Sequence, residues 1–226
     1  MSKITVILAE DHEVVREGLR ALLKAESDIE IVGEVKTGRE AVKMAIKLQP
    51  NVVVMDIAMP QLNGLEATRQ ILRDTDSTKI VILSTYNDED YVEQSTNAGA
   101  IAYLIKQSAA SDVIRAIREA KEGNSYFSPS IARRMLDHCR RAFLEGKAPS
   151  KTADDLTSRE RETLQLIAEG MTNKAIADEL SISIKTVEKH RQQVMNKLNI
   201  HDIAGLTRYA MARGFIESNP AIVAES

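Results

Sequence analysis

The sequence predicts an α/β domain built on a doubly wound, five-stranded parallel sheet, followed by a smaller all-helical domain of four helices. Over the first 126 residues, short apolar runs alternate five times with segments of helical periodicity. These runs are continuously apolar, which is typical of parallel strands that helices cover on both faces. The last 70 residues show four segments of helical periodicity. At 226 residues, 43% of them hydrophobic, the chain can bury two separate cores.

The first domain consists of five strand-helix units in succession. Strands are expected at 3–9, 29–35, 52–55, 80–83 and 101–105, and the helices that follow them at 14–23, 41–48, 65–72, 91–98 and 111–122. Right-handed crossovers and the strand order 2-1-3-4-5 bring the carboxyl ends of the first and third strands together. Ligands bind at that edge in sheets of this kind.

Polar side chains suited to phosphoryl chemistry follow four of the predicted strands. Glu10 and Asp11 follow the first strand, and Asp56 follows the third, so three carboxylates share one crevice. Such crowding favours a cation, and hard oxygen ligands suit Mg²⁺. Asp56 is the candidate nucleophile, Lys106 can pair with a phosphate oxygen, and Ser84 can donate a hydrogen bond to the same group.

Each of these residues also has a simpler interpretation. Glu10 and Asp11 can serve only to favour the start of the next helix, and Asp56 can belong to an ordinary loop. An isolated Lys106 is usually a solvated charge, and Ser84 alone is uninformative. Their joint position at the strand ends that meet at one edge of the sheet favours a shared site.

A basic segment separates the two domains. Residues 1–126 hold 15 Lys and Arg against 20 Asp and Glu, so the first domain would repel DNA. Residues 128–151 hold 6 against 2, and their helical pattern allows packing of Ile131 and Met135 on either domain, or contact with DNA. The expected divisions are the first domain at 1–124, a linker with a helix at 125–153, the second domain at 154–217 and a flexible tail at 218–226.

Cysteine content and apolar run length exclude two further classes of protein. Cys139 is the only cysteine, so no intrachain disulfide and no multi-cysteine zinc site can form. No apolar run approaches the roughly 18 residues of a membrane span, and no charged leader with an apolar core precedes the first strand. We therefore expect a cytoplasmic protein without a membrane partner.

The second domain has the pattern of a helix-turn-helix. Thr157 precedes the first helix in a capping arrangement, and Gly170 ends that helix. A short helix at 173–180, a turn at 181–183 and a longer helix at 185–198 follow, with a fourth helix at 202–213. This geometry inserts the third helix into the major groove of DNA. A basic helix face that is merely solvated is the simpler alternative.

The motifs of the first domain resemble those of receiver domains in two-component response regulators, over residues 3 to about 122. The matching segments are Leu8-Ala-Glu-Asp-His12, Val54-Met-Asp-Ile-Ala-Met-Pro60, Asn63-Gly64, Ile82-Leu-Ser84, Ala98-Gly-Ala100 and Tyr103-Leu-Ile-Lys106. The resemblance implies a flavodoxin-like fold. It also implies that a sensor histidine kinase phosphorylates Asp56.

The same resemblance implies roles for the surrounding residues. Glu10 and Asp11 would hold Mg²⁺ together with Asp56 and the backbone carbonyl of Ala58. Ser84 and Lys106 would contact the phosphoryl group. Ser84 and a buried aromatic residue, here Tyr103, would form the switch that reshapes the domain surface, although plain strand packing is an alternative for Tyr103.

The second domain, from 155 to about 217, resembles LuxR-type helix-turn-helix domains, and the whole chain is similar to response regulators of the NarL/FixJ type. The motifs are Leu156-Thr157, Arg159-Glu-Arg-Glu162, Leu166-Ile-Ala-Glu-Gly170, Asn173 to Ala177, and Thr186-Val187 followed by His190. The resemblance implies base contacts from Glu188, Lys189 and Gln192. Glu188 departs from many relatives and must avoid the phosphates. Phosphate contacts are expected from Thr172, Asn173, Lys174, Lys185, Thr186, Arg191 and Lys197.

Together these patterns predict a phosphorylation-dependent transcriptional regulator rather than an enzyme. The expected chemistry is self-catalysed phosphotransfer to Asp56 and slow autodephosphorylation, followed by homodimerisation on paired DNA half-sites. One rival is a metal-dependent phosphatase, against which the chain offers no second carboxylate at near-adjacent sequence spacing to Asp56 that would serve as general acid, and carries a predicted DNA-binding domain. Another is a receiver that is never phosphorylated and serves only to dimerise.

Overall fold

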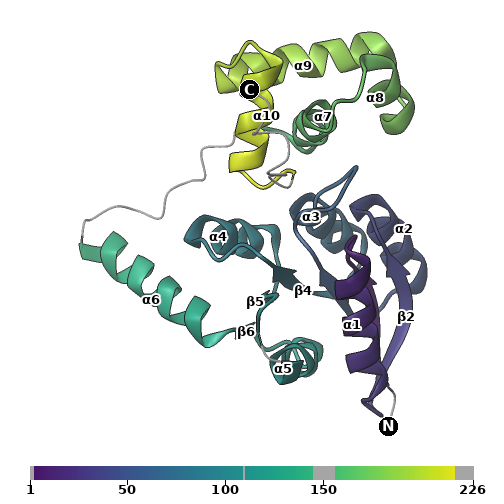
Figure 1. The fold of residues 1–226 in the computed structure, drawn as a ribbon, viewed down its shortest axis with the longest axis vertical. Helices are drawn as coiled ribbons and strands as arrows, with labels where there is room; N and C mark the ends of the chain where they lie inside the picture. Colours follow the sequence, from purple (N-terminus) through teal and green to yellow (C-terminus); the bar gives the residue numbers. More distant parts are fainter. Residues whose placement is uncertain (1–2, 109, 145–155, 217–226) are drawn as a thin grey trace.

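A computed structural model describes residues 3–108, 110–144 and 156–216 of the chain. The α/β domain and the helical domain lie against each other, and a long helix leads away from the sheet (Figure 1). Two predicted segments lie outside the described residues. They are residues 145–153 of the linker and the tail at 218–226. Within the described part, no helix is long and apolar enough to cross a membrane.

The sheet is parallel and has the strand order β2-β1-β3-β4-β5-β6. Its first five strands confirm the predicted order. The sixth, which pairs with β5, was missed, because two residues are too few to show any periodicity and because they fall in the predicted linker. The strands are β1 (Ile4–Ala9), β2 (Ile29–Val35), β3 (Val52–Met55), β4 (Lys79–Ser84), β5 (Ala102–Ile105) and β6 (Tyr126–Phe127).

Five helices cover the two faces of the sheet. Because side chains alternate across a strand, Ile7 and Val53 point to one apolar core while Leu8 and Val54 point to the other. Helices α2, α3 and α4 pack in the first core, and α1 and α5 pack in the second. The helices are α1 (Glu13–Lys24), α2 (Gly38–Leu48), α3 (Gly64–Asp74), α4 (Glu89–Ala98) and α5 (Ala110–Lys121).

Helix α6 (Pro129–Leu144) begins as part of the α/β domain. Ile131 is fully buried in the core on the α4 side, and Met135 packs against that core. Arg134 donates a hydrogen bond to the Asn87 carbonyl oxygen at 2.6 Å. Of the two packing partners that the sequence left open for this helix, the structure therefore selects the α/β domain.

The second domain has the four predicted helices, each with a side-chain cap at its start. Thr157 and Glu160 form a capping box at α7, and Thr172, Ser183 and Asp202 cap the next three helices. A common apolar core includes residues from all four helices. The helices are α7 (Ser158–Ala168), α8 (Asn173–Leu180), α9 (Ile184–Leu198) and α10 (Ile203–Ala212).

Candidate functional site

The strand ends bring three residues that are distant in the sequence into direct contact. Asp56 follows β3 and is 3% exposed, and Glu10 follows β1 and is 2% exposed. Lys106 follows β5, and its Nζ lies 2.9 Å from Asp56 Oδ2 and 2.9 Å from Glu10 Oε2. The ammonium group thus links the two buried carboxylates at the edge of the sheet where the sequence predicts a shared site.

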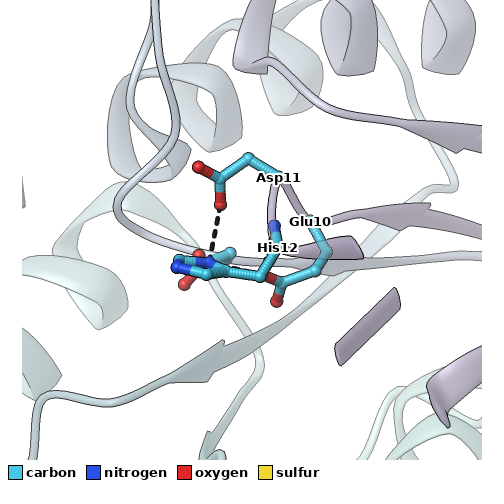
Figure 2. A group of neighbouring side chains, drawn as sticks. Glu10, Asp11 and His12 are labelled. Atoms are coloured by element: carbon cyan, nitrogen blue, oxygen red, sulfur yellow. Dashed lines mark hydrogen bonds and ion pairs between the residues drawn. The ribbon is translucent and has the colours of Figure 1, made fainter. Parts of the chain in front are cut away.

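Asp11 and His12 complete a cluster of possible metal ligands. One ligand atom from each of Glu10, Asp11, His12 and Asp56 lies within 4.8 Å of the others. His12 Nδ1 lies 3.0 Å from Asp11 Oδ1 and 3.1 Å from Glu10 Oε1 (Figure 2). Three carboxylates fit a hard divalent cation such as Mg²⁺. Sequence reasoning did not assign a role to His12, although its position next to two acidic residues in a loop was a usable signal.

Burial and charge set the protonation of the cluster. Burial raises the pKa of Asp56 to about 7, Lys106 opposes this rise, and Glu10 adds to it. Burial lowers the pKa of Lys106, but the attraction of Asp56 and Glu10 outweighs burial and holds that pKa above its usual value. One ammonium group among several carboxylates leaves an excess of negative charge, which favours a bound cation.

Ser84 and Tyr103 both contact the backbone of Tyr86. Ser84 is fully buried, and its Oγ accepts a hydrogen bond from Tyr86 N at 3.1 Å. Tyr103 is 1% exposed and donates its hydroxyl hydrogen to the Tyr86 carbonyl oxygen at 2.7 Å. The Tyr86 ring stacks on Tyr91 of α4, with 4.3 Å between centroids. Tyr86 therefore connects the two predicted switch residues. Sequence reasoning assigned no role to Tyr86.

The loop after β3 carries the remaining predicted metal ligand. Ala58 is 4% exposed, and it lines a cavity of about 210 Å³ together with Asp11. Asp56 Oδ1 accepts a hydrogen bond from Ile57 N at 2.8 Å, which orients the carboxylate at the start of this loop. Glu169 and Ile216 of the helical domain line the same cavity.

The candidate reading surface is the outer face of α9. This helix lies on the side of the helical domain away from the sheet (Figure 1). Val187 and Val194 face the domain core. The predicted base-contacting residues, Glu188, Lys189 and Gln192, are exposed, as are Thr172, Lys174 and Lys185. Thr186 is half-buried beside the Ser183 cap, with 2.8 Å between the two hydroxyl oxygens.

Three of the predicted phosphate contacts, Asn173, Arg191 and Lys197, take part in side-chain contacts between helices of the domain. Arg191 Nη1 donates to Asn173 Oδ1 at 2.9 Å, which ties α9 to α8. Lys197 Nζ lies 2.7 Å from Glu160 Oε2, which ties α9 to α7. These side chains therefore stabilise the arrangement of the helices in the protein without DNA.

Two protein-family profiles match the chain, and they define its class. The response regulator receiver domain matches residues 6–118, and the luxR family of bacterial regulatory proteins matches residues 154–210. The chain therefore belongs to the response regulators that join a receiver domain to a LuxR-type DNA-binding domain. We call its α/β domain the receiver and its helical domain the reader.

Similar proteins are transcriptional regulators of two-component systems. The transcriptional regulatory protein LiaR of Bacillus subtilis is 42% identical over 207 residues, covering 92% of this chain and 96% of LiaR. The response regulator VraR of Staphylococcus aureus is 35% identical, covering 95% of this chain and 99% of VraR. The chain is thus a transcriptional regulator of this type.

Solved structures of relatives include complexes with DNA. RcsB of Salmonella enterica serovar Typhimurium, bound to a promoter in the presence of a phosphomimetic, is 25% identical, with a TM-score of 0.59 over 92% of this chain and 98% of RcsB. A structure of two RcsB dimers bound to two parallel DNAs is 26% identical, with a TM-score of 0.57 over 94% of this chain and 99% of RcsB.

Proposed function

We propose that Asp56 accepts a phosphoryl group from a sensor histidine kinase and that this event controls operator binding by the reader. The observation that carries the proposal is the contact of the Asp56 carboxylate with Lys106, at a strand end, beside Glu10 and Asp11. A buried nucleophile with a fixed cation on one side and further carboxylates on the other suits phosphoryl transfer.

The residues of the cluster have separate tasks in this reaction. An oxygen of Asp56 forms the bond to phosphorus while the bond from phosphorus to the donor histidine nitrogen breaks, and that nitrogen keeps the electron pair. Lys106 then stabilises charge on a phosphoryl oxygen. Glu10, Asp11, Asp56 and the Ala58 carbonyl would hold Mg²⁺, which when bound neutralises charge on the transferring group.

Ser84 and Tyr103 transmit the change in charge to the domain surface. In this proposal the Ser84 hydroxyl turns towards the phosphoryl group and gives up its bond to Tyr86 N. Tyr86 also holds the Tyr103 hydroxyl and stacks on Tyr91, so its movement disturbs the start of α4. The phosphoryl group then favours one of two alternative packings of this surface.

The reader binds double-stranded DNA through α9. Lys189 is suited to guanine, Gln192 to adenine, and Glu188 to the cytosine amino group. A single reader contacts only a short stretch of DNA, so we propose that a homodimer binds paired half-sites. The structure of RcsB dimers bound to DNA supports this proposal by analogy. DNA as the target implies action in the cytoplasm.

We also propose that the protein does not turn over phosphate esters as an enzyme. Phosphotransfer to Asp56 is self-catalysed, and the phosphoryl group leaves by slow autodephosphorylation. A phosphatase would release inorganic phosphate from small esters with Mg²⁺ at many turnovers for each protein molecule. No release of phosphate from small esters, together with release from an acyl phosphate donor no faster than the labelled protein loses its phosphoryl group, supports the proposal.

The decisive experiment labels the full chain with a small acyl phosphate donor and Mg²⁺. Wild type is expected to acquire one phosphoryl group, seen as a mobility shift, and Asp56→Asn is expected to acquire none. Asp74→Asn is the matched control, because Asp74 is an exposed aspartate of α3 that pairs only with Arg73 among the described contacts. Persistent label on Asp56→Asn would refute the assignment.

A further inference from the structure

The loop that follows the candidate phosphoacceptor is held by a side chain of the other domain. Gln165 of α7 is fully buried. Its Oε1 accepts a hydrogen bond from Asn63 N at 2.8 Å, and its Nε2 donates to the Met59 carbonyl oxygen at 2.9 Å. One amide group of the reader therefore connects both ends of the turn between β3 and α3.

Glu169 holds the middle of the same loop. Its Oε1 accepts hydrogen bonds from Gln61 N and from Gln165 Nε2, both at 2.9 Å. Gln61 has a φ of 67°, in the left-handed region that residues other than glycine seldom occupy. The bond from Glu169 thus stabilises a loop conformation that is intrinsically unfavourable.

The same glutamate lies beside the acidic cluster. Glu169 and Ile216 line the cavity that Asp11 and Ala58 also line. A carboxylate at this position adds to the negative charge that an incoming phosphoryl donor meets. Burial raises the pKa of Glu169, with Gln165 and Gln61 N opposing that rise, which indicates a poorly solvated position.

A second set of contacts anchors the reader beside the loop. Arg39 of α2 lies 3.2 Å from Glu162 Oε2 and 2.8 Å from Glu179 Oε1, so it joins the receiver to both α7 and α8. Gln70 Nε2 of α3 donates to Glu162 Oε1 at 3.0 Å. Glu162 is 4% exposed, and a buried carboxylate of this kind depends on its partners.

We propose that Gln165 and Glu169 form a clamp on the phosphoacceptor loop, which slows phosphoryl transfer to Asp56 while the reader is docked on the receiver. Both are positioning residues, since they act through the loop backbone and the charge at the cavity. Docking leaves the reading face of α9 exposed, so the clamp acts on the phosphoacceptor site and not by covering that face.

The test compares full-length variants by their initial rate of labelling with a small acyl phosphate and Mg²⁺. Gln165→Ala removes both bonds to the loop ends and is expected to speed labelling about fivefold, the equivalent of one net hydrogen bond. Gln193→Ala is the matched control, because Gln193 is a half-buried glutamine of α9 outside the clamp, and its rate should equal that of wild type.

Hydrogen exchange distinguishes the clamp from a general loss of stability. In Gln165→Ala the Asn63 and Gln61 amides should exchange faster, while the core amides of β1 and β3 and the thermal unfolding midpoint of the reader stay as in wild type. If Gln165→Ala does not fold, Glu169→Ala decides, since it removes both the acceptor of the Gln61 amide hydrogen and the charge at the cavity. A wild-type labelling rate in the deciding folded variant would overturn the clamp.

The clamp rests on the proposed role of Asp56, and the two ideas fail in different ways. If wild type itself acquires no label, the phosphoacceptor assignment is wrong. If wild type is labelled on Asp56 and the deciding variant is labelled equally fast, the assignment stands and the clamp is wrong.

Discussion

Asp56 combines burial with a charge-rich surrounding, and this governs its proton affinity. Its folded pKa of about 7 lies above the ordinary aspartate value of 3.8 that applies to the unfolded chain. Between these values the folded protein holds a proton that the unfolded chain releases. Without a metal, the contribution of Asp56 to stability is therefore present at low pH and is lost as the pH rises through this window.

The same proton competes with a metal ion. We expect the dissociation constant for Mg²⁺ to be about tenfold weaker at pH 6 than at pH 8, because a ligand with a pKa near 7 must lose its proton to bind. Calorimetric titration of the full chain at the two pH values measures the change. Asp56→Asn should bind more weakly and with little dependence on pH, and an unchanged constant for wild type would contradict the assignment of Asp56 as a ligand.

At the scale of elements, α9 is fixed to its neighbours by polar contacts and keeps its outer face open. Arg191 and Lys197 bind to α8 and α7, while Lys189 and Gln192 are exposed. The residues that tie α9 to the neighbouring helices thus differ from those predicted to contact bases, of which Gln192 donates a hydrogen bond to Asn196 of the same helix at 2.9 Å. Lys185, at the start of the helix, is exposed as well, and its position favours a phosphate contact.

Substitutions on α9 should separate base recognition from phosphate binding. Lys189→Ala is expected to weaken binding to the preferred operator by about 1–3 kcal/mol and to relax selectivity at one base pair. Lys185→Ala should weaken binding to all sequences alike and lower the salt dependence. Both are measured by titrating a panel of operator variants at two salt concentrations. Equal losses for Lys189→Ala on every sequence would contradict base recognition.

In the molecule as a whole, the two domains also meet at α4, away from the clamp and from the contacts of Arg39 and Gln70. Gly214, after α10, lies against Tyr91 of α4, and a Cβ there would come within 2.2 Å of the Tyr91 ring. Its φ is +68°, so the position favours glycine on conformational grounds as well. Tyr91 stacks on Tyr86, which joins this contact to the proposed switch.

Gly214→Ala should therefore loosen the docking of the reader. Gly170→Ala is a matched control, since Gly170 has a φ of +82° but no atom within 4 Å of an added Cβ. Both changes carry a similar backbone strain of about 1 kcal/mol, and only the first creates a clash. Small-angle scattering should report a larger radius of gyration for Gly214→Ala alone. Equal radii would show that this contact does not hold the domains together.

Local pattern and the rules of parallel sheets are enough to predict much of this molecule. The continuous apolar runs predict the first five strands, and the order 2-1-3-4-5 that is common in doubly wound sheets predicts which strand ends meet. Asp56, Glu10 and Lys106 follow from that order, because the carboxyl ends of parallel strands meet at one edge. The four helices of the reader follow from their caps and apolar spacing.

Only the tertiary structure shows which surfaces meet. Gln165 and Glu169 have the polar character of solvated helix residues, yet Gln165 is fully buried against the phosphoacceptor loop. A polar side chain can form its hydrogen bonds with water or with another domain. The outcome depends on the surface that lies opposite the side chain, and the neighbouring residues in the sequence do not encode that surface. The same reason explains β6, which exists because β5 offers it an edge to pair with. Sequence patterns therefore predict the two folds and the cluster of Glu10, Asp56 and Lys106, whereas the contacts of Gln165 and Glu169 with the loop after β3 arise from the packing of one domain on the other.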